Sequence, residues 1–319
     1  MPKLAAAATV AILLVVLAGC GDDAEVASTA SREVELALDF TPNAVQAPVF
    51  TAAREHLDRK RGIRLKIRPP GSGPDGLKLV ATGRVDLALL DIHDLAIAQE
   101  KGGDVVGVGA LVAKPLAALL AQPGIRRPRD LEGRTVGVSG LPSDPAFLRA
   151  IVEFDGGDAT KVRQITIGFA AVQAILSRKI DAVPAFWTAE GIALRERGRD
   201  VRAFKIEDFG APQFPEVVVV TSRATLERRR ADIRAAVAAI ADGVTATRAR
   251  PEAAVTEIAA AAGGADPSLI RAQLDAVAPL WSDDLRLDRR VLEDWATWDA
   301  KVGMVKRRPD VGTLFAFDG

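Results

Sequence analysis

The stretch LALDFTPNAVQAPVF, Leu36–Phe50, decides the fold class of this chain. Apolar residues occupy every second position from Val34 to Phe40, which predicts a buried β-strand. The polar turn Thr41-Pro42-Asn43 ends that strand, and a helix is predicted over 44–59. In an open α/β sheet such a turn lies at the carboxyl end of the strand, where free backbone N–H groups and the positive end of the helix dipole face a crevice. The stretch therefore predicts an α/β sheet that holds a ligand at this turn.

The same residues also fit an ordinary strand-to-helix turn. In that interpretation Pro42 stiffens the loop and Asn43 caps the helix without contacting a ligand. The residues alone leave both interpretations open.

Strand and helix patterns alternate through the middle of the chain, which favours mainly parallel sheets. Polar or Gly-rich loops follow predicted strands at 69–74, 91–94 and 139–145. Loops of this kind gather at one edge of a parallel sheet, so we expect them to converge on one cleft. The charged, Pro-rich stretch 126–130 predicts a crossing between two lobes, and the apolar strand 217–220 predicts the return.

This pattern predicts two lobes built from non-consecutive parts of the chain. Lobe 1 comprises 34–121 and 217–319, and lobe 2 comprises 122–216. The C-terminal part is mostly helical by its apolar periodicity. Trp295 and Trp298 share one face of a predicted helix there, and we interpret them as packing residues rather than ligand contacts.

The first 20 residues are predicted to be a targeting segment rather than part of the fold. An apolar run, shorter than the ~20 residues of a comfortable membrane span, leads to Leu17-Ala18-Gly19-Cys20. This motif resembles the lipobox of lipoprotein signal peptides and predicts lipidation of Cys20. Cys20 is the only cysteine, so no disulfide can form within the chain. The small, polar stretch 21–33 predicts a flexible tether.

The charge of the chain is balanced, with 42 basic and 42 acidic residues. Lys and Arg are scattered along the sequence, so nothing suggests a nucleic-acid partner. The sequence contains no phosphate-binding loop, no Ser-His-Asp arrangement and no cluster with metal-ligand spacing. We therefore expect no cofactor and no metal.

Several separated segments resemble one family of binding proteins. Asp39–Asn43 carries the family's pattern of Asp, an aromatic residue, Thr or Phe, and then Pro-Asn. The other segments are PLAALLAQ and RDLEGRTVGVSGLPSD within 115–144, IGFAAVQAILSRKIDAVPAFWTAEG at 167–191, and FGAPQFPEVVVV at 209–220. In this order they resemble the periplasmic-type binding proteins for thiamine-pyrimidine precursors. Those proteins belong with the sulfonate-, nitrate- and riboflavin-binding components of ABC importers.

The resemblance implies a two-lobe type II periplasmic binding protein that closes by a hinge around its ligand. An aminopyrimidine needs aromatic faces and a polar edge. We assign the faces to Phe40, Trp187 and Phe214, and the edge to Asn43 and Glu190. The full set of predicted ligand-binding residues is Asp39, Phe40, Asn43, Gln46, His93, Ser139, Asp144, Trp187, Glu190, Phe214 and Glu216.

The chain departs from the family pattern in several places. It has no tyrosine, so Phe186 and Phe214 stand where relatives often carry one, and Gln46 stands where a histidine is common. His93 and Asp94 are left open as further contacts. Riboflavin, a sulfonate and nitrate remain alternative ligands.

The resemblance also bears on the choice between binding and catalysis. The same superfamily includes pyrimidine synthases, which resemble these binding proteins but use an active-site lysine, a histidine and a cysteine-rich iron motif. With Cys20 as its only cysteine, this chain lacks that motif, and we predict a binding protein rather than an enzyme. The predicted partners are an ABC permease, its ATPase, and the outer face of the cell membrane through the lipid anchor.

Overall fold

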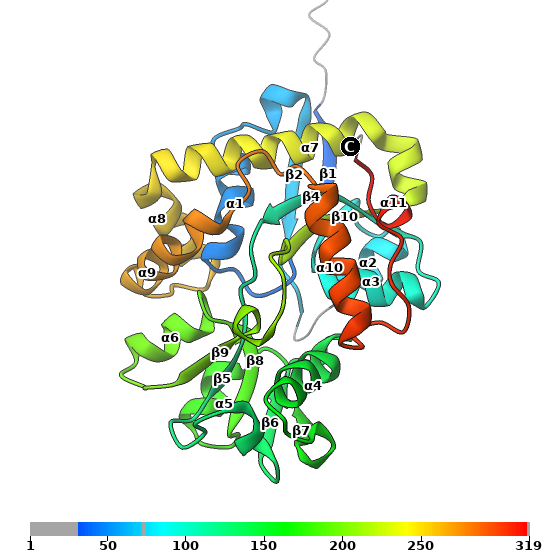
Figure 1. Ribbon diagram of the computed structural model, residues 1–319. Helices are drawn as coiled ribbons and strands as arrows, with labels where there is room; N and C mark the ends of the chain where they lie inside the picture. The colour runs from blue at the N-terminus through cyan, green and yellow to red at the C-terminus, as the bar shows by residue number, and fades with distance from the viewer. Residues whose placement is uncertain (1–30, 72–74, 318–319) are drawn as a thin grey trace, which may run out of the picture. The chain divides into compact units, whose positions relative to one another are not determined.

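Two five-stranded sheets form the framework of the structure (Figure 1). The computed structural model describes residues 31–71 and 75–317, and the predicted signal peptide, Cys20 and most of the predicted tether lie outside them. The first sheet has the order β2 (Ile63–Arg68), β1 (Arg32–Ala37), β3 (Leu87–Asp91), β10 (Val217–Ser222), β4 (Val105–Val112). The second has the order β7 (Arg163–Thr166), β6 (Thr135–Val138), β8 (Ala182–Phe186), β5 (Ala117–Ala121), β9 (Arg202–Lys205).

Each sheet contains one strand that runs against the other four. In the first sheet β1 pairs in parallel with β2 and β3, whereas β10 is antiparallel to β3 and β4. In the second, β6 pairs in parallel with β7 and β8, whereas β5 is antiparallel to β8 and β9. The reversed strands β5 and β10 are those that the chain forms directly after it passes from one sheet to the other. The predicted α/β fold class with two mainly parallel sheets is confirmed.

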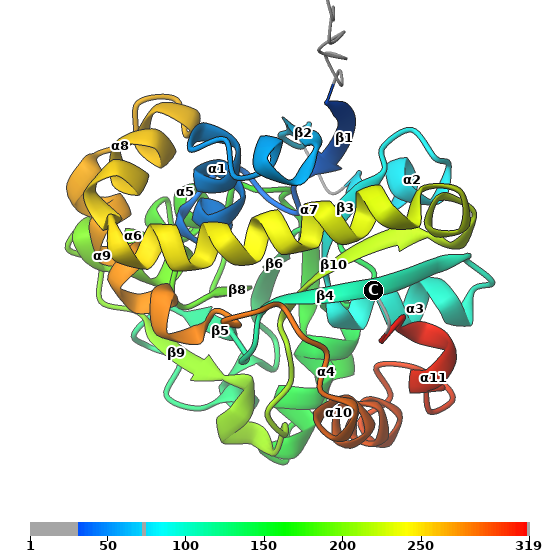
Figure 2. The same ribbon diagram turned by 90° about the horizontal axis from the view of Figure 1, so that it is seen from above.

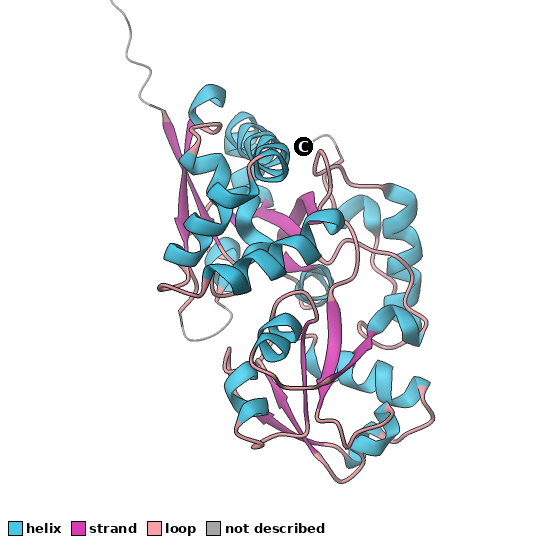
Figure 3. Ribbon diagram, turned by 90° about the vertical axis from the view of Figure 1, so that its left-hand side faces the viewer, coloured by secondary structure: helices cyan, strands magenta, loops and turns pink. Residues whose placement is uncertain are grey.

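Helices surround both sheets, as Figure 3 shows. Those that precede β10 are α1 (Ala47–Arg54), α2 (Gly76–Ala81), α3 (Ile92–Glu100), α4 (Asp144–Phe154), α5 (Ala171–Leu176) and α6 (Glu190–Glu196). Those that follow β10 are α7 (Arg223–Ala249), α8 (Pro251–Ala261), α9 (Pro267–Val277), α10 (Arg289–Lys301) and α11 (Val311–Leu314). Short 3₁₀ helices occupy Ala44–Gln46, Arg59–Arg61, Pro128–Leu131, Ala159–Lys161, Ile206–Phe209 and Ala278–Leu280.

The first crossing between the sheets comes earlier than predicted. We assigned 117–121 to lobe 1 and placed the crossing at 126–130, but β5 is hydrogen-bonded on both sides within the second sheet. The chain therefore crosses at 113–116, and the charged stretch leads into the 3₁₀ helix Pro128–Leu131. The sequence of a short apolar strand does not tell which of two sheets it joins, because its pairing depends on partners far away in the sequence. The outer limits of the two lobes stay a prediction.

The strand and the helix that the stretch Leu36–Phe50 forms also differ from prediction at their ends. β1 begins at Arg32, so the last two residues of the predicted tether belong to the sheet. The helix predicted over 44–59 is a 3₁₀ turn followed by α1, which ends at Arg54. His56 then takes a φ of 56°, and the buried Asp58 accepts a hydrogen bond from the N–H of Leu65. This contact turns the chain back into β2.

Helix α7 crosses the first sheet and packs against α1 (Figure 2). The two helices approach closely at Gly243, where an added Cβ would lie 2.1 Å from the carbonyl oxygen of Pro48. On α10, Trp295 is fully buried and Trp298 is nearly so, in one apolar cluster with residues of both sheets. Both tryptophans are thus packing residues, as predicted.

Candidate functional site

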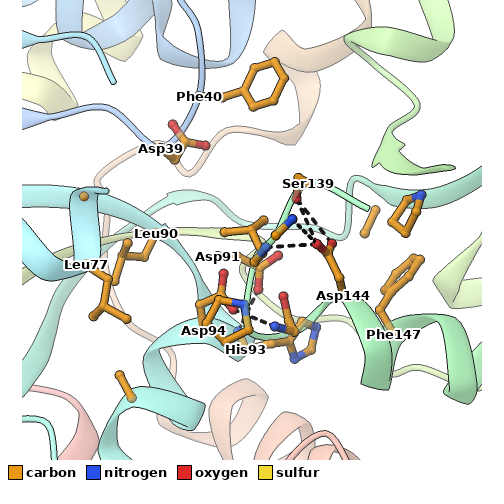
Figure 4. A pocket seen from close by; sticks show the side chains of 18 of the residues that line it. Asp39, Phe40, Leu77, Leu90, Asp91, His93, Asp94, Ser139, Asp144 and Phe147 are labelled. Atoms are coloured by element: carbon orange, nitrogen blue, oxygen red, sulfur yellow. Dashed lines mark hydrogen bonds between the residues drawn. The ribbon is translucent and has the colours of Figure 1, made fainter. Parts of the chain in front are cut away.

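The carboxyl ends of strands from both sheets enclose a cavity of about 520 Å³. The residues after β1, β3 and β6 and those at the end of β8 line it (Figure 4). Small-molecule sites usually measure ~300 to 1,000 Å³. The predicted segments 91–94 and 139–145 therefore do meet around a space of suitable size. The predicted loop 69–74 contributes no described residue to the lining, and 72–74 lie outside the described residues.

The turn after β1 is held by a network of amide groups. Asn43 caps the 3₁₀ turn, since its Oδ1 accepts from the N–H of Val45 at 2.9 Å and its Nδ2 donates to the carbonyl of Thr41 at 3.1 Å. Gln46 Oε1 accepts from the N–H of Asn43 at 3.0 Å, and its Nε2 donates to Asp39 Oδ1 at 2.9 Å. Asn43 is therefore a cap that also lines the cavity, and Gln46 orients Asp39 from behind.

The junction between β3 and α3 carries three polar residues close together in the sequence. Asp91 caps α3 by accepting from the N–H of His93 at 2.7 Å. Asp94, only 1% exposed, accepts at Oδ1 from the N–H of Ser143 at 2.9 Å. This hydrogen bond joins α3, which packs on the first sheet, to the loop that precedes α4 beside the second sheet.

His93 lines the cavity, but its Nδ1 contacts residues of α10. Its Nδ1 lies 2.7 Å from Asp299 Oδ1 and 3.2 Å from Trp295 Nε1. A nitrogen cannot donate and accept at once, and the shorter contact with a carboxylate decides that Nδ1 donates to Asp299. Burial lowers the pKa of His93, but the negative charges of Asp299, Asp91 and Glu216 outweigh it and raise that pKa to about 10. His93 is a buried cation paired with Asp299.

The loop after β6 folds around Asp144. Its Oδ2 accepts from the N–H groups of Gly140 at 2.8 Å and Leu141 at 2.9 Å, and from Ser139 Oγ at 3.1 Å. Burial raises the pKa of Asp144, and these hydrogen bonds oppose that rise. A carboxylate that accepts three donors from one loop holds that loop in place and has little capacity left for a ligand.

Glu190 begins α6 and lines the cavity from the second sheet. Its Oε2 accepts from the N–H of Phe186 at 3.1 Å, and the residue is 8% exposed. Burial raises the pKa of Glu190 to about 7, against the hydrogen bonds from its own N–H and that of Phe186. An ionised carboxylate offers about four acceptor positions, so Glu190 can accept further donors or share a proton near neutral pH.

The cavity is acidic. Five carboxyl groups line it, and burial is the first cause that raises the pKa of each, namely Asp39, Asp91, Asp94, Asp144 and Glu190. The two lysines of the lining, Lys78 and Lys101, are exposed to solvent. The carboxyl groups of the lining would repel a bound anion, whereas a neutral molecule with N–H groups would donate hydrogen bonds to them.

Seven of the predicted ligand-binding residues line this cavity, namely Asp39, Phe40, Asn43, His93, Ser139, Asp144 and Glu190. Gln46, Trp187, Phe214 and Glu216 do not line it. Lys205 Nζ lies 3.8 Å from the centre of the Trp187 ring, and Phe214 is fully buried against His93 with ring centroids 4.9 Å apart. These residues were selected by type and position in a motif, which does not fix the direction of a side chain.

Glu216 holds the two crossings of the chain together. Its Oε2 accepts from the N–H groups of Leu116 and of Ala117, the latter at 2.9 Å. Leu116 ends the first crossing and Glu216 ends the second, so this fully buried carboxylate bridges the two segments that connect the sheets. Glu216 thus lies between the two connecting segments and not in the lining of the cavity.

Sequence reasoning missed the aromatic faces that the cavity has. Phe147 of α4 and Phe186 at the end of β8 line it with Phe40, whose ring packs on that of Phe169 with centroids 4.3 Å apart. Phe186 was named only as a replacement for tyrosine, although successive side chains of a strand alternate in direction, so that Phe186 and Trp187 cannot both face the cavity. Asp91 was also missed, and its place at a strand end before a helix was the available signal.

A family model described as NMT1/THI5-like matches residues 43–254. The chain belongs to this family. Its predicted kinship with binding proteins for thiamine-pyrimidine precursors is confirmed at this level. A formylaminopyrimidine-binding protein of Halalkalibacterium halodurans is 32% identical over 219 residues, which are 68% of this chain and 66% of that protein. The match thus spans just under two thirds of that relative's length.

A weaker relative is an enzyme. The 4-amino-5-hydroxymethyl-2-methylpyrimidine phosphate synthase THI12 of Saccharomyces cerevisiae is 25% identical over 154 residues, 47% of this chain and 45% of the enzyme. Among solved structures, the alkanesulfonate-binding protein SsuA of Xanthomonas axonopodis matches with a TM-score of 0.73 at 15% identity, over 89% of this chain and 98% of that protein. This likeness confirms the periplasmic binding protein fold and carries no information on the ligand.

Within 31–71 and 75–317, no group of three or more His, Cys, Asp or Glu side chains is arranged to hold a metal ion. Of the helices in these same ranges, none has the length and apolar character needed to cross a membrane.

Proposed function

We propose that this chain is the solute-binding component of an ABC importer and that it binds an aminopyrimidine precursor of thiamine in the cavity between its sheets. In this proposal Cys20 carries a lipid anchor on the extracytoplasmic side of the membrane, and a permease with its ATPase receives the ligand. The name of the 32% identical relative and the acidic, aromatic lining of the cavity support the proposal. No chemistry on the ligand is involved.

The acid–base properties of Glu190 carry the choice of ligand. An aminopyrimidine presents a ring nitrogen beside an exocyclic amino group, so its edge offers one acceptor and one donor. A carboxyl group that shares a proton near neutral pH matches both, because it can donate to the ring nitrogen while it accepts from the amino group. Glu190 has a pKa of about 7 and lines the cavity, which suits it to this pairing.

The aromatic lining supports a flat ligand. Phe40, Phe147 and Phe186 offer ring faces or edges to the cavity from three different elements. Stacking on an aromatic ring contributes ~0.5 to 1.5 kcal/mol beyond the area that it buries. A small heterocycle gains from such contacts more than a sulfonate or nitrate does.

Charge argues against the alternative ligands of the sulfonate and nitrate type. These ligands are permanent anions, and buried carboxyl groups surround the cavity. Among the described residues, the buried basic residue that lines it is His93, which is already paired with Asp299. Desolvating an anion without a cationic partner costs several kcal/mol. Riboflavin is neutral and stays a candidate on this criterion.

A thermal-shift panel tests the ligand. A ligand that binds only the folded state raises its stability by RT ln(1 + [L]/Kd). We expect formylaminomethyl- and hydroxymethyl-aminopyrimidine to raise the melting temperature of the purified chain, and taurine and nitrate to leave it unchanged. In Glu190→Leu, which can neither donate to the ring nitrogen nor accept from the amino group, the affinity for both pyrimidines is expected to fall roughly 10- to 100-fold, the usual result of removing a buried hydrogen-bonding partner of a ligand.

The matched control is Glu196→Leu, which makes the same change at an exposed position of the same helix. It should bind as the unmodified chain does. A shift with taurine or riboflavin alone would overturn the pyrimidine assignment and keep the transport role. Conversion of the pyrimidine to another product, detected by mass spectrometry, would favour the second candidate, an enzyme related to the synthases that the chain resembles at 25% identity.

A further inference from the structure

The two carboxyl oxygens of the buried Asp94 have different surroundings. Its Oδ1 accepts from the N–H of Ser143 at 2.9 Å, while its Oδ2 is buried without a hydrogen-bond partner among the residues that the structure describes. The residue is 1% exposed and lines the cavity beside Asp91 (Figure 4). A polar atom in that situation costs ~1 to 3 kcal/mol unless something binds it. The cavity supplies the place for that missing partner.

The surroundings of Asp94 oppose a negative charge. Burial is the main cause that raises the pKa of Asp94, to about 8, and the neighbouring carboxyl groups of Asp91 and Asp144 add to it, against hydrogen bonding from the side chain and the backbone N–H of Ser143. Of the cations nearby, Lys78 and Lys101 are exposed and His93 is paired with Asp299 on its other side. At neutral pH the carboxyl group is therefore mostly protonated.

The hydrogen bond with Ser143 then fixes where the proton sits. Oδ1 accepts from a backbone N–H, so the proton of the neutral acid lies on Oδ2, the atom that has no partner. A buried O–H group at the cavity wall requires an acceptor. Asp144 differs from Asp94, because its Oδ2 already accepts from three groups of its own loop.

We propose that Asp94 is a specificity-determining residue which meets the ligand as a neutral carboxylic acid. Its Oδ2–H donates to a ring nitrogen or carbonyl oxygen of the bound molecule, while Oδ1 holds the N–H of Ser143 from the opposite side of the cavity. The inference rests on the proposed function in taking this cavity as the ligand site. It adds that the ligand must carry a further acceptor atom besides the ring nitrogen and the amino group that Glu190 recognises.

The amide of Asp94→Asn imitates a neutral acid, since its oxygen accepts from Ser143 and its NH₂ group donates to the ligand. We expect Kd for formylaminomethyl-aminopyrimidine, measured by calorimetry at pH 7, to stay within about threefold of the unmodified value. Asp94→Leu has neither function and should weaken binding roughly 10- to 100-fold. Between pH 7 and pH 9 the unmodified chain should lose about tenfold in affinity relative to Asp94→Asn, because its acid ionises near pH 8 and the amide does not.

A second measurement needs no ligand. Infrared difference spectra of the unmodified chain minus Asp94→Asn at pH 7 should contain the carbonyl stretch of a protonated carboxyl group, and this band should vanish as the pH rises past 8. Asp208→Asn, an exposed position, is the control for the same change of residue and should give no such band. A spectrum with carboxylate bands only at pH 7 overturns the proposal.

Binding data can overturn it separately. A loss of more than about thirtyfold in Asp94→Asn with an unchanged melting temperature would mean that Asp94 meets the ligand as an anion. Parallel pH profiles of Asp94→Asn and the unmodified chain would also contradict the proposal. If no pyrimidine binds the unmodified chain, the proposed function fails, and the infrared result still decides the state of Asp94.

Discussion

Two groups of buried acids in this molecule differ in what satisfies them. The cavity acids, Asp94 and Glu190, each accept one backbone N–H and face the cavity, and each has a raised pKa. The core acids, Glu216 and Asp299, are fully buried away from it. Glu216 Oε2 accepts from two backbone N–H groups and Asp299 Oδ1 lies 2.7 Å from Nδ1 of the His93 cation, while Glu216 Oε1 and Asp299 Oδ2 have no hydrogen-bond partner among the described residues. Burial alone therefore does not mark a functional acid. A position in the wall of the cavity does.

The comparison predicts opposite effects on stability, and the largest belongs to a core acid. Asp299→Asn leaves the buried His93 cation without its partner, which should lower the free energy of unfolding by ~3 to 5 kcal/mol near neutral pH. Urea unfolding followed by circular dichroism measures this. The matched control is Asp294→Asn, an exposed position on the same helix, which should stay within ~0.5 kcal/mol.

The pH dependence of that loss identifies its cause. The pKa of His93 is raised from 6.5 to about 10, so the stabilisation from its charge is complete below pH 6.5 and disappears as the pH rises through 10. The difference between the unmodified chain and Asp299→Asn should therefore shrink between pH 7 and pH 10. A constant difference would mean that Asp299 acts through packing and not through the ion pair.

The cavity acid Glu190 should respond in the other direction. The pKa of Glu190 is raised from 4.5 to about 7, so its favourable contribution is present below pH 4.5 and is lost as the pH rises through 7. Glu190→Gln carries no charge and should be more stable than the unmodified chain by ~1 to 3 kcal/mol at pH 9, while the two converge near pH 5. Thermal unfolding at both pH values checks this. Lower stability of the variant at pH 9 would place Glu190 among the core acids.

The smallest effect is expected at Glu216, between the two segments that connect the sheets. In Glu216→Gln the side-chain oxygen still accepts from the crossing, but without a charge, so the free energy of unfolding should fall by ~1 to 2 kcal/mol. Amide exchange at Leu116 and Ala117 should quicken, because their N–H groups donate to Oε2 of this residue. Unchanged exchange at these two amides would contradict the bridging role.

The sequence predicted most of the segments that form the site, but not every residue that lines the cavity. It predicted the loops after β1, β3 and β6, because apolar alternation followed by polar turns is a local signal. It selected Trp187 over Phe186, since the order of two adjacent aromatic residues does not tell which one the strand turns toward the cavity. It also placed Phe214 and Glu216 in the site, although both pack behind it.

The sequence by itself determined the α/β class, the strand-turn-helix unit around Asp39–Asn43, the capping role open to Asn43, and the family. All of these depend on periodicity, turn chemistry or motifs within a few residues. Only the tertiary structure decided that β5 belongs to the second sheet, that His93 pairs with Asp299, and that Asp94 meets Ser143. Each of these joins residues far apart in the chain. Burial and charge at such contacts, and so the pKa of each acid, arise only when the two sheets come together.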